Sequence, residues 1–112
     1  MSITKISDDF FVGPQIEPSD VAALAQNGFR SVICNRPDNE QAGQPSAEAM
    51  GKAATEAGLA FHYIPVVPGQ SGRAEVEAMA KALKAADGPV FAYCRSGARS
   101  AGLFQAARAA VT

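Results

Sequence analysis

The sequence is poor in cysteine, has no long apolar run, and carries no excess of either charge. Its two cysteines, Cys34 and Cys94, are too few for a disulfide framework and lack the paired spacing of a zinc site. The first residues, MSITKISDDFF, contain no signal-peptide core, and no run approaches the roughly 20 apolar residues of a membrane span. These absences predict a reducing, cytoplasmic location and indicate no metal or organic cofactor.

Charge is balanced along the chain. Ten basic residues stand against eleven acidic ones, giving a formal net charge of -1. Such a chain has no global field to attract nucleic acid or an anionic membrane, so neither is expected as a partner, and any bound anion must be held locally. The length of 112 residues supports a single domain, residues 1–112, with a core of its own.

Hydrophobic periodicity alternates between strand-like and helix-like segments. Strands are predicted at residues 10–14, 29–35, 59–67 and 90–93. Helices are predicted at residues 21–26, 47–57, 73–86 and 99–110. This alternation is typical of an α/β fold, here a mostly parallel sheet of four or five strands with helices on both faces, in three layers.

Two irregular segments follow predicted strands. Residues 35–46 are rich in proline, glycine and amides, and a turn at residues 68–72 follows the third strand. In sheets of this kind, ligands bind outside the carboxyl ends of the strands. Asn35, residues 65–72 and Cys94 all fall at that edge, which is therefore the predicted site.

Cys94 sits on a strand-to-helix turn. Backbone N–H groups of such a turn and the positive end of the helix form an anion cradle, which lowers a cysteine pKa from about 8.5 into the range of roughly 3.5 to 7.5. Gly97 permits a positive φ, and Arg99 is predicted to clamp the bound anion. Arg95 is expected to point outward, and Ser100 to donate a hydrogen bond to the thiolate. The simpler alternative is that Cys94 is a small buried residue at a strand end.

The turn Cys94-Arg95-Ser96-Gly97-Ala98-Arg99 resembles the rhodanese active-site loop, Cys-x-x-Gly-x-Arg, whose cysteine carries a transferable sulfur as a persulfide. By this resemblance Arg95, Ser96, Gly97 and Ala98 form the anion-binding loop, and Cys94, Arg99 and Ser100 are the catalytic residues. The wider chain, in the stretches ISDDFFVGPQIEPSDVAAL, GFRSVICNRPDNE, HYIPV and GPVFAYCRSGARSAGL, resembles the beta-lactamase-hydrolase-like, phosphatase-like family. That resemblance implies a dual-specificity-phosphatase fold and, in fused members, sulfurtransferase or persulfide-oxidising metallo-hydrolase domains.

The loop itself separates the two implied chemistries. Four residues lie between Cys94 and Arg99, whereas cysteine phosphatases place one more, which puts Ser100 at the position of their arginine. A shorter loop favours one sulfur atom over a phosphoryl group. Phosphatases of this fold also keep an aspartate after the third strand, whereas residues 65–72 contain no carboxylate. Asp38 or Glu40 could replace that acid only if their loop folds over the site.

Further residues are candidates for the surroundings of the site. They are Asn35, Arg36, Asp38, Gln70, Ser71 and Cys34. Cys34 could resolve a persulfide or sulfenic acid on Cys94 as a disulfide, or could be a buried thiol. Arg36 could bind an anionic substrate or form an ordinary salt bridge. Gln70 and Ser71 could bind substrate or merely solvate a turn, and His62 is more often a structural residue than a catalytic one.

The sequence therefore predicts a cysteine-dependent sulfurtransferase acting on a small sulfur-containing anion or persulfide. A cysteine phosphatase acting on a phosphate ester is the first alternative, and a non-enzymatic anion-binding or thiol redox-sensing module is the second. The resemblance adds a possible persulfide-oxidising metallo-hydrolase partner. The last helix stops close to Thr112, so a missing C-terminal segment is expected, and an apolar face exposed there would favour a homodimer or a docking partner.

Overall fold

The computed structural model describes residues 1–70 and 72–110. The strands are β1 (Thr4–Ser7), β2 (Phe10–Gly13), β3 (Ser31–Cys34), β4 (Ala60–Tyr63) and β5 (Val90–Tyr93). The helices are a 3₁₀ turn η1 (Pro18–Asp20), α1 (Val21–Gln26), α2 (Ala47–Glu56), α3 (Arg73–Ala85) and α4 (Ala98–Ala110). None of the helices within these described ranges combines the length and apolarity needed to cross a bilayer.

The sheet is mostly parallel. Its strands lie in the order β1-β2-β5-β3-β4, with β1 antiparallel to β2 and all other neighbours parallel. The two central strands β3 and β5 are buried at every position, as expected of parallel strands covered on both faces. In register, Cys34 of β3 lies opposite Tyr93 of β5, so the two strands end together.

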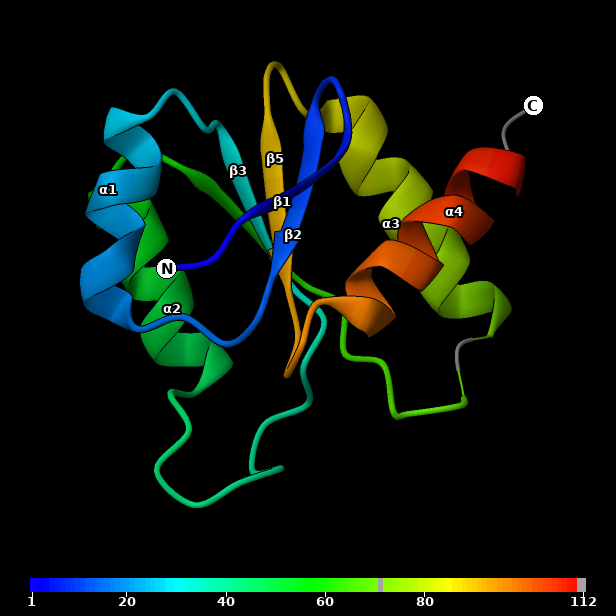
Figure 1. Ribbon diagram of the computed structural model, residues 1–112, viewed down its shortest axis with the longest axis horizontal. Coiled ribbons are helices and arrows are strands. Elements are labelled where there is room, and N and C mark those ends of the chain that lie inside the picture. The colour runs from blue at the N-terminus through cyan, green and yellow to red at the C-terminus, as the bar shows by residue number, and fades with distance from the viewer. Residues whose placement is uncertain (71, 111–112) are drawn as a thin grey trace.

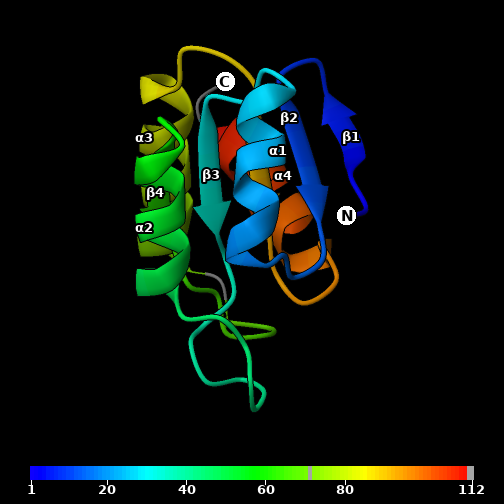
Figure 2. The ribbon, with the colours of Figure 1, turned by 90° about the vertical axis from the view of Figure 1, so that its left-hand side faces the viewer.

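Helices cover both faces of the sheet and give three layers. Helices α1 and α2 lie on one face, and α3 and α4 lie on the other (Figure 1; the view in Figure 2 looks onto α1 and α2). Each face has its own apolar cluster. Ile33, Met79 and Leu103 belong to the cluster under α3 and α4, and Val32, Met50 and Phe91 belong to the one under α1 and α2. The α/β, three-layer prediction is confirmed.

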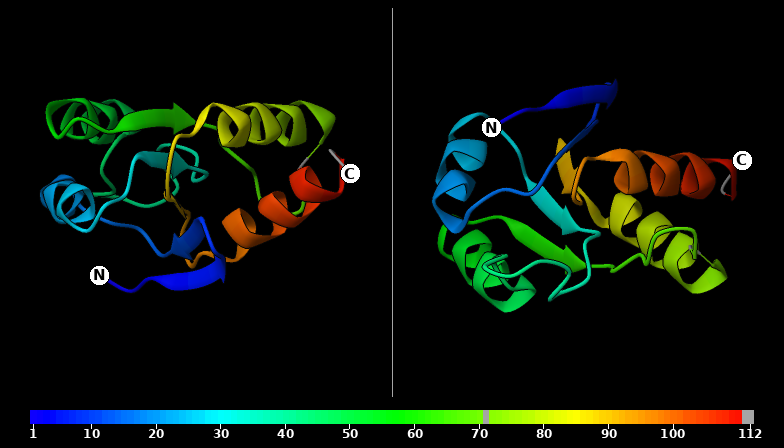
Figure 3. Two further views of the ribbon diagram at one scale, coloured as in Figure 1. Left: turned by 90° about the horizontal axis from the view of Figure 1, so that it is seen from above. Right: turned by 60° about the horizontal axis from the view of Figure 1, so that its bottom comes forward.

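The strand directions gather three loops at one edge. The segments that follow β3, β4 and β5 leave the sheet together at the bottom of Figure 1, and the tilted view in Figure 3 brings this edge forward. This is the carboxyl edge at which parallel sheets bind ligands.

Strand β1 is missing from the sequence-based prediction. Its four residues, TKIS, are largely exposed and carry no apolar alternation that could mark a strand. Pairing with β2 creates it, because a sheet edge offers unpaired backbone groups to any adjacent extended segment.

Most other boundaries shift by a residue or two, and the third predicted strand is much shorter than expected. It was predicted over residues 59–67, yet β4 ends at Tyr63. Beyond it, the N–H groups of Ile64 and Val66 still donate to the carbonyls of Cys34 and Asn35, both at 2.9 Å. The apolar run thus continues as a loop in which Ile64 and Val66 are buried and hydrogen-bonded to the end of β3, while Val67 is exposed.

Candidate active site

Cys94 lies at the floor of a backbone cradle. The residue is fully buried, and the N–H of Gly97 donates to its Sγ at 3.0 Å. Burial alone would raise the pKa of the Cys94 thiol, but backbone N–H groups of Ser100, Ser96, Gly97 and Arg99 face the sulfur, and together they hold the pKa below its usual value. Four backbone N–H groups thus surround the sulfur of Cys94 and favour its ionised form.

Two glycines allow the turn to take this path. Gly97 has a φ of 96°, and a Cβ there would lie 3.4 Å from the carbonyl carbon and oxygen of Gly13. A Cβ on Gly13 would in turn collide with the carbonyl oxygen of Ser2 and approach the Phe91 ring at 2.9 Å. Gly97 thus lets the cysteine loop approach the end of β2, and Gly13 lets the end of β2 pack against Ser2 and the Phe91 ring.

The guanidinium of Arg99 is already engaged. Its Nη1 and Nη2 donate to the two carboxylate oxygens of Glu40 at 2.8 and 2.9 Å, and Nη1 also donates to the carbonyl of Val66 at 2.8 Å. The pKa of Arg99 is raised, first by Glu40 and further by the neighbouring Cys94. The guanidinium of Arg99 thus lies beside Cys94, with the carboxylate of Glu40 bound to two of its nitrogens, and its role as an anion clamp stays a prediction.

Glu40 is held in turn by Arg36. The Arg36 side chain is 4% exposed, and its Nε donates to Glu40 Oε1 at 3.0 Å. Its remaining nitrogens donate to the amide oxygens of Gln15 and Gln41 at 3.1 and 3.3 Å. Hydrogen bonds from Arg99 and Arg36 lower the pKa of Glu40 against the opposing effect of burial. Of the two interpretations of Arg36, the salt bridge with a nearby acid is the one present.

Asn35 and Asp38 support the loops that frame the site. Asn35 is buried, and its Nδ2 donates to the carbonyl of Ile64 at 2.8 Å. Asp38 accepts from the N–H of Ala47 at the start of α2 at 2.8 Å, and its own N–H donates to the hydroxyl of Tyr63 at 3.0 Å. These contacts tie the segments after β3 and β4 together beside Cys94.

Cys34 shares its environment with Tyr93 rather than with Cys94. Both Cys34 and Tyr93 belong to the apolar cluster under α1 and α2, and alternation along β5 turns the next residue, Cys94, the other way. The Cys34 thiol donates to the carbonyl of Arg36 at 3.3 Å, and burial raises its pKa. Both thiols are free, and the role of Cys34 as a resolving thiol stays a prediction.

The remaining candidate residues differ in how far they are buried. Ser100 is buried, but among the described residues its hydroxyl has no hydrogen-bond partner, and it faces Cys94 through its backbone N–H instead of the predicted hydroxyl. Arg95 and Gln70 are exposed, and Ser71 lies outside the described residues. His62 is half-buried on the edge strand β4, and desolvation lowers its pKa.

Sequence reasoning missed two partners of the site. Gln15, which binds Arg36, lies just after β2, and the carbonyl of Val66, which binds Arg99, lies just after β4. Both stand at the carboxyl edge that the strand pattern already marked, so position along the sheet was the available signal. The sequence suggests Glu40 only as a replacement acid, and nothing in it indicates the pairing with Arg99.

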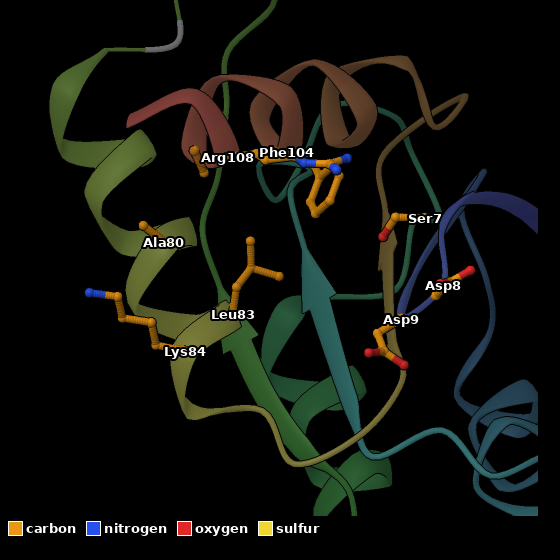
Figure 4. Close-up of a pocket in the computed structure, with 9 residues that line it drawn as sticks. Ser7, Asp8, Asp9, Ala80, Leu83, Lys84, Phe104 and Arg108 are labelled. Carbon is orange, nitrogen blue, oxygen red and sulfur yellow. The ribbon is translucent and has the colours of Figure 1, made fainter. Parts of the chain in front are cut away.

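A separate cavity lies at the opposite edge of the sheet. It has a volume of about 430 Å³ and opens between the β1–β2 turn and helices α3 and α4, over Leu83 and Phe104 (Figure 4). Ser7 and Asp9 line it at the amino end of β2. The cavity is therefore remote from Cys94 and has no part in the site.

Comparison with known proteins assigns the class. The sequence model of the family described as "Beta-lactamase hydrolase-like protein, phosphatase-like domain" matches residues 2–111. A protein from Neisseria meningitidis whose crystal structure describes it as a candidate phosphatase is 35% identical, with a TM-score of 0.86 over 98% of this chain and 78% of that one. A candidate phosphatase from Shewanella putrefaciens, 22% identical over 95% of this chain and 66% of that one, shares the fold with a TM-score of 0.81.

The protein is thus a phosphatase-like α/β domain, and the fold implied by the resemblance is confirmed. More particularly, the chain belongs to the family of beta-lactamase hydrolase-like, phosphatase-like domains. The beta-lactamase hydrolase-like protein of Xylella fastidiosa is 33% identical over 104 residues, which cover 93% of this chain. The matched part is 24% of that relative, so the chain spans about a quarter of the length of the curated relatives it matches.

Proposed function

We propose that this domain is a cysteine-dependent sulfurtransferase in which Cys94 accepts a sulfane sulfur and carries it as a persulfide. The observation that carries the proposal is the state of the two carboxylates in residues 35–46. Glu40 is ionised and paired with two arginines, and Asp38 accepts from the backbone of α2. Residues 65–72 contain no carboxylate. Both loop carboxylates thus already accept hydrogen bonds from within the protein, which argues against either serving as the general acid.

The missing acid matters differently to the two chemistries. Transfer of a phosphoryl group to cysteine expels an alkoxide, and a positioned general acid accelerates such steps by about 10²- to 10⁴-fold. Attack of a thiolate on a sulfur atom expels a thiolate or sulfite, which leaves without protonation. Four residues between Cys94 and Arg99 also make a cradle suited to a single sulfur atom.

The proposed cycle has two displacement steps. The Cys94 thiolate attacks the outer sulfur of a persulfide R–S–SH, a new S–S bond forms at Cys94, and the donor's S–S bond breaks with RS⁻ leaving with the bonding electron pair. A second thiolate then attacks the outer sulfur on Cys94 and restores the Cys94 thiolate. The N–H groups that face Sγ stabilise the negative sulfur at the start and at the end of the cycle.

A cysteine phosphatase acting through a phosphocysteine is the second candidate. The family description and the Neisseria relative favour it, and they support it more directly than they support sulfur transfer. With no acid in place, such an enzyme would work best on aryl phosphates, whose leaving groups need little protonation.

Intact-mass spectrometry separates the candidates. The wild type, Cys94→Ser and the matched control Cys34→Ser are incubated with glutathione persulfide and then with a thiol acceptor. Sulfur transfer predicts a gain of about 32 Da that the acceptor removes, present in Cys34→Ser and absent in Cys94→Ser. Adduct formation that survives Cys94→Ser contradicts the proposal. Phosphate release from an aryl ester that depends on Cys94, without any sulfur adduct, establishes the phosphatase instead.

Two protein partners are part of the proposal: a metallo-hydrolase and a second copy of this domain. We propose that the domain works beside a persulfide-oxidising metallo-hydrolase, as its resemblance to fused members implies. Self-association into a homodimer is likewise a prediction, and size-exclusion chromatography with light scattering measures it directly.

A further inference from the structure

Glu40 reaches the site from a different part of the chain than the arginine it binds. It lies in the loop after β3, whereas Arg99 stands in the first turn of α4. Its two oxygens meet the two Nη atoms of Arg99 at 2.8 and 2.9 Å. This bidentate geometry is the one in which a guanidinium binds a carboxylate or an oxyanion. Glu40 therefore occupies the donors that an anionic substrate would use.

A second arginine, Arg36, holds Glu40 in its position. Arg36, with 4% of its side chain exposed, donates to Glu40 Oε1 at 3.0 Å, and two glutamines hold the rest of its guanidinium. Asn39, directly before Glu40, has a φ of 66°, a left-handed turn that asparagine tolerates better than most residues. Swinging Glu40 away would leave a buried arginine without its anion, which is costly.

The cluster offers an anion few unpaired positive groups. Arg36 and Arg99 are positive, and the carboxylate of Glu40 accepts hydrogen bonds from both. A dianion entering the cradle would meet Glu40 and an arginine whose two Nη atoms are already bound to it. A neutral or singly charged donor needs no such displacement, because its sulfur has only to reach the thiolate.

We propose that Glu40 is a specificity-determining residue that fills the fork of Arg99 and excludes dianions, such as phosphate monoesters and thiosulfate, from Cys94. As a statement about which sulfur donors are accepted, this inference rests on the proposed sulfurtransferase function. The preferred donor is then an organic persulfide whose reacting end carries at most one negative charge. The exclusion of dianions is a property of the pocket that can be measured without any turnover.

The first experiment measures anion binding alone. Cys94 is treated with iodoacetamide in the presence of increasing inorganic phosphate, at a pH where phosphate is mainly the dianion. Peptide mass spectrometry then gives the phosphate concentration that halves the labelling of Cys94. Glu40→Gln keeps the shape of the side chain and removes its charge. It should lower the half-protecting phosphate concentration by about tenfold or more, because the fork of Arg99 becomes available. Glu77→Gln, the same change on the exposed face of α3, should behave like the wild type.

An unchanged or higher half-protecting concentration in Glu40→Gln overturns the inference, since Glu40 would then only position Arg99. If this variant does not fold, Glu40→Asp serves the same comparison. It keeps a negative charge, but its chain is one methylene shorter, so its carboxylate is drawn back from Arg99. The same fall in the protecting concentration is expected.

The second experiment tests the choice of donor. Steady-state sulfur transfer is compared for thiosulfate and for cysteine persulfide in the wild type and Glu40→Gln. The KM for thiosulfate should fall by about tenfold, while the KM for cysteine persulfide changes by less than about threefold. Equal changes for both donors overturn the specificity role. If neither donor loads sulfur but phosphate protection still improves, the sulfurtransferase proposal fails and the role of Glu40 stands.

Discussion

Replacing Gly97 by alanine tests how the cysteine loop is built. At a φ of 96° an alanine is strained, and its Cβ would lie 3.4 Å from two backbone atoms of Gly13. Holding a residue other than glycine in such a conformation costs about 1–3 kcal/mol. Unfolding entropy of about 2.1 cal/mol/K per residue makes 1 kcal/mol worth roughly 4 °C for a chain of this length, so the Tm of Gly97→Ala should fall by about 4–12 °C.

The same substitution should weaken the thiolate. The N–H of Gly97 donates to Cys94 Sγ at 3.0 Å, and a loop that relaxes to relieve the alanine turns this donor away. A hydrogen bond to a charged group is worth about 1.5–3 kcal/mol, which corresponds to about one to two pH units in the pKa of the thiol. Alkylation of Cys94 by iodoacetamide, followed against pH, should show its midpoint rising by about one unit.

Gly102→Ala, in the helix α4 that follows the cysteine loop, is the matched control. No atom lies within 4 Å of a Cβ at Gly102, and alanine is favoured over glycine in a helix interior by about 0.5–1 kcal/mol. This variant should melt slightly higher than the wild type and keep its alkylation midpoint. If Gly97→Ala matches the wild type in both Tm and midpoint, the cradle does not depend on the left-handed turn, and the argument for the thiolate is refuted.

Three further predictions follow from the same framework. Folding lowers the pKa of Cys94 below its ordinary value, so between the two pKa values the folded state binds fewer protons than the unfolded state. The stability of the wild type relative to Cys94→Ser should therefore rise with pH across that interval, and this gain should be lost as the pH falls through the lowered pKa. Urea titrations at several pH values measure the difference. Asn35→Leu should reduce the free energy of unfolding by about 1–3 kcal/mol, because the carbonyl of Ile64 loses its buried donor; an unchanged urea midpoint would exclude this support. Gly13→Ala should destabilise the domain strongly through its contact with the Phe91 ring, and a Tm equal to that of the wild type would show that β2 can move freely.

Much of the fold could be read from local pattern. The last strand is observed at the predicted residues 90–93, and α3 follows the stripe of Val76, Met79 and Leu83 almost to its predicted end. Burial on both faces gives parallel strands a continuous apolar signal, and periodicity detects it well. Strand β1 could not be predicted in this way, because it exists only through pairing with β2.

The candidate site likewise has one part that the local sequence indicates and one part that depends on contacts between distant residues. Cys94, Gly97 and Arg99 are neighbours in the sequence, so the order of residues already indicates a thiolate cradle. Glu40 lies 59 residues from Arg99 along the chain, and the contact between them depends on how a proline-rich loop folds in three dimensions. No local rule states which of two arginines such a carboxylate will meet, and here it meets both.

The cradle around Cys94 consists of main-chain N–H groups, while the side chains of Arg95, Ser96 and Ala98 are exposed. The environment of the thiol is thus set by the path of the backbone, whereas the carboxylate that binds Arg99 comes from a separate loop after β3. An engineer could therefore replace those three exposed residues, or graft a different loop in place of residues 35–46, and obtain enzymes that share one nucleophile but act on different substrates. Evolution has the same freedom, since a change of substrate in such a scaffold need not pass through a variant that has lost its thiolate.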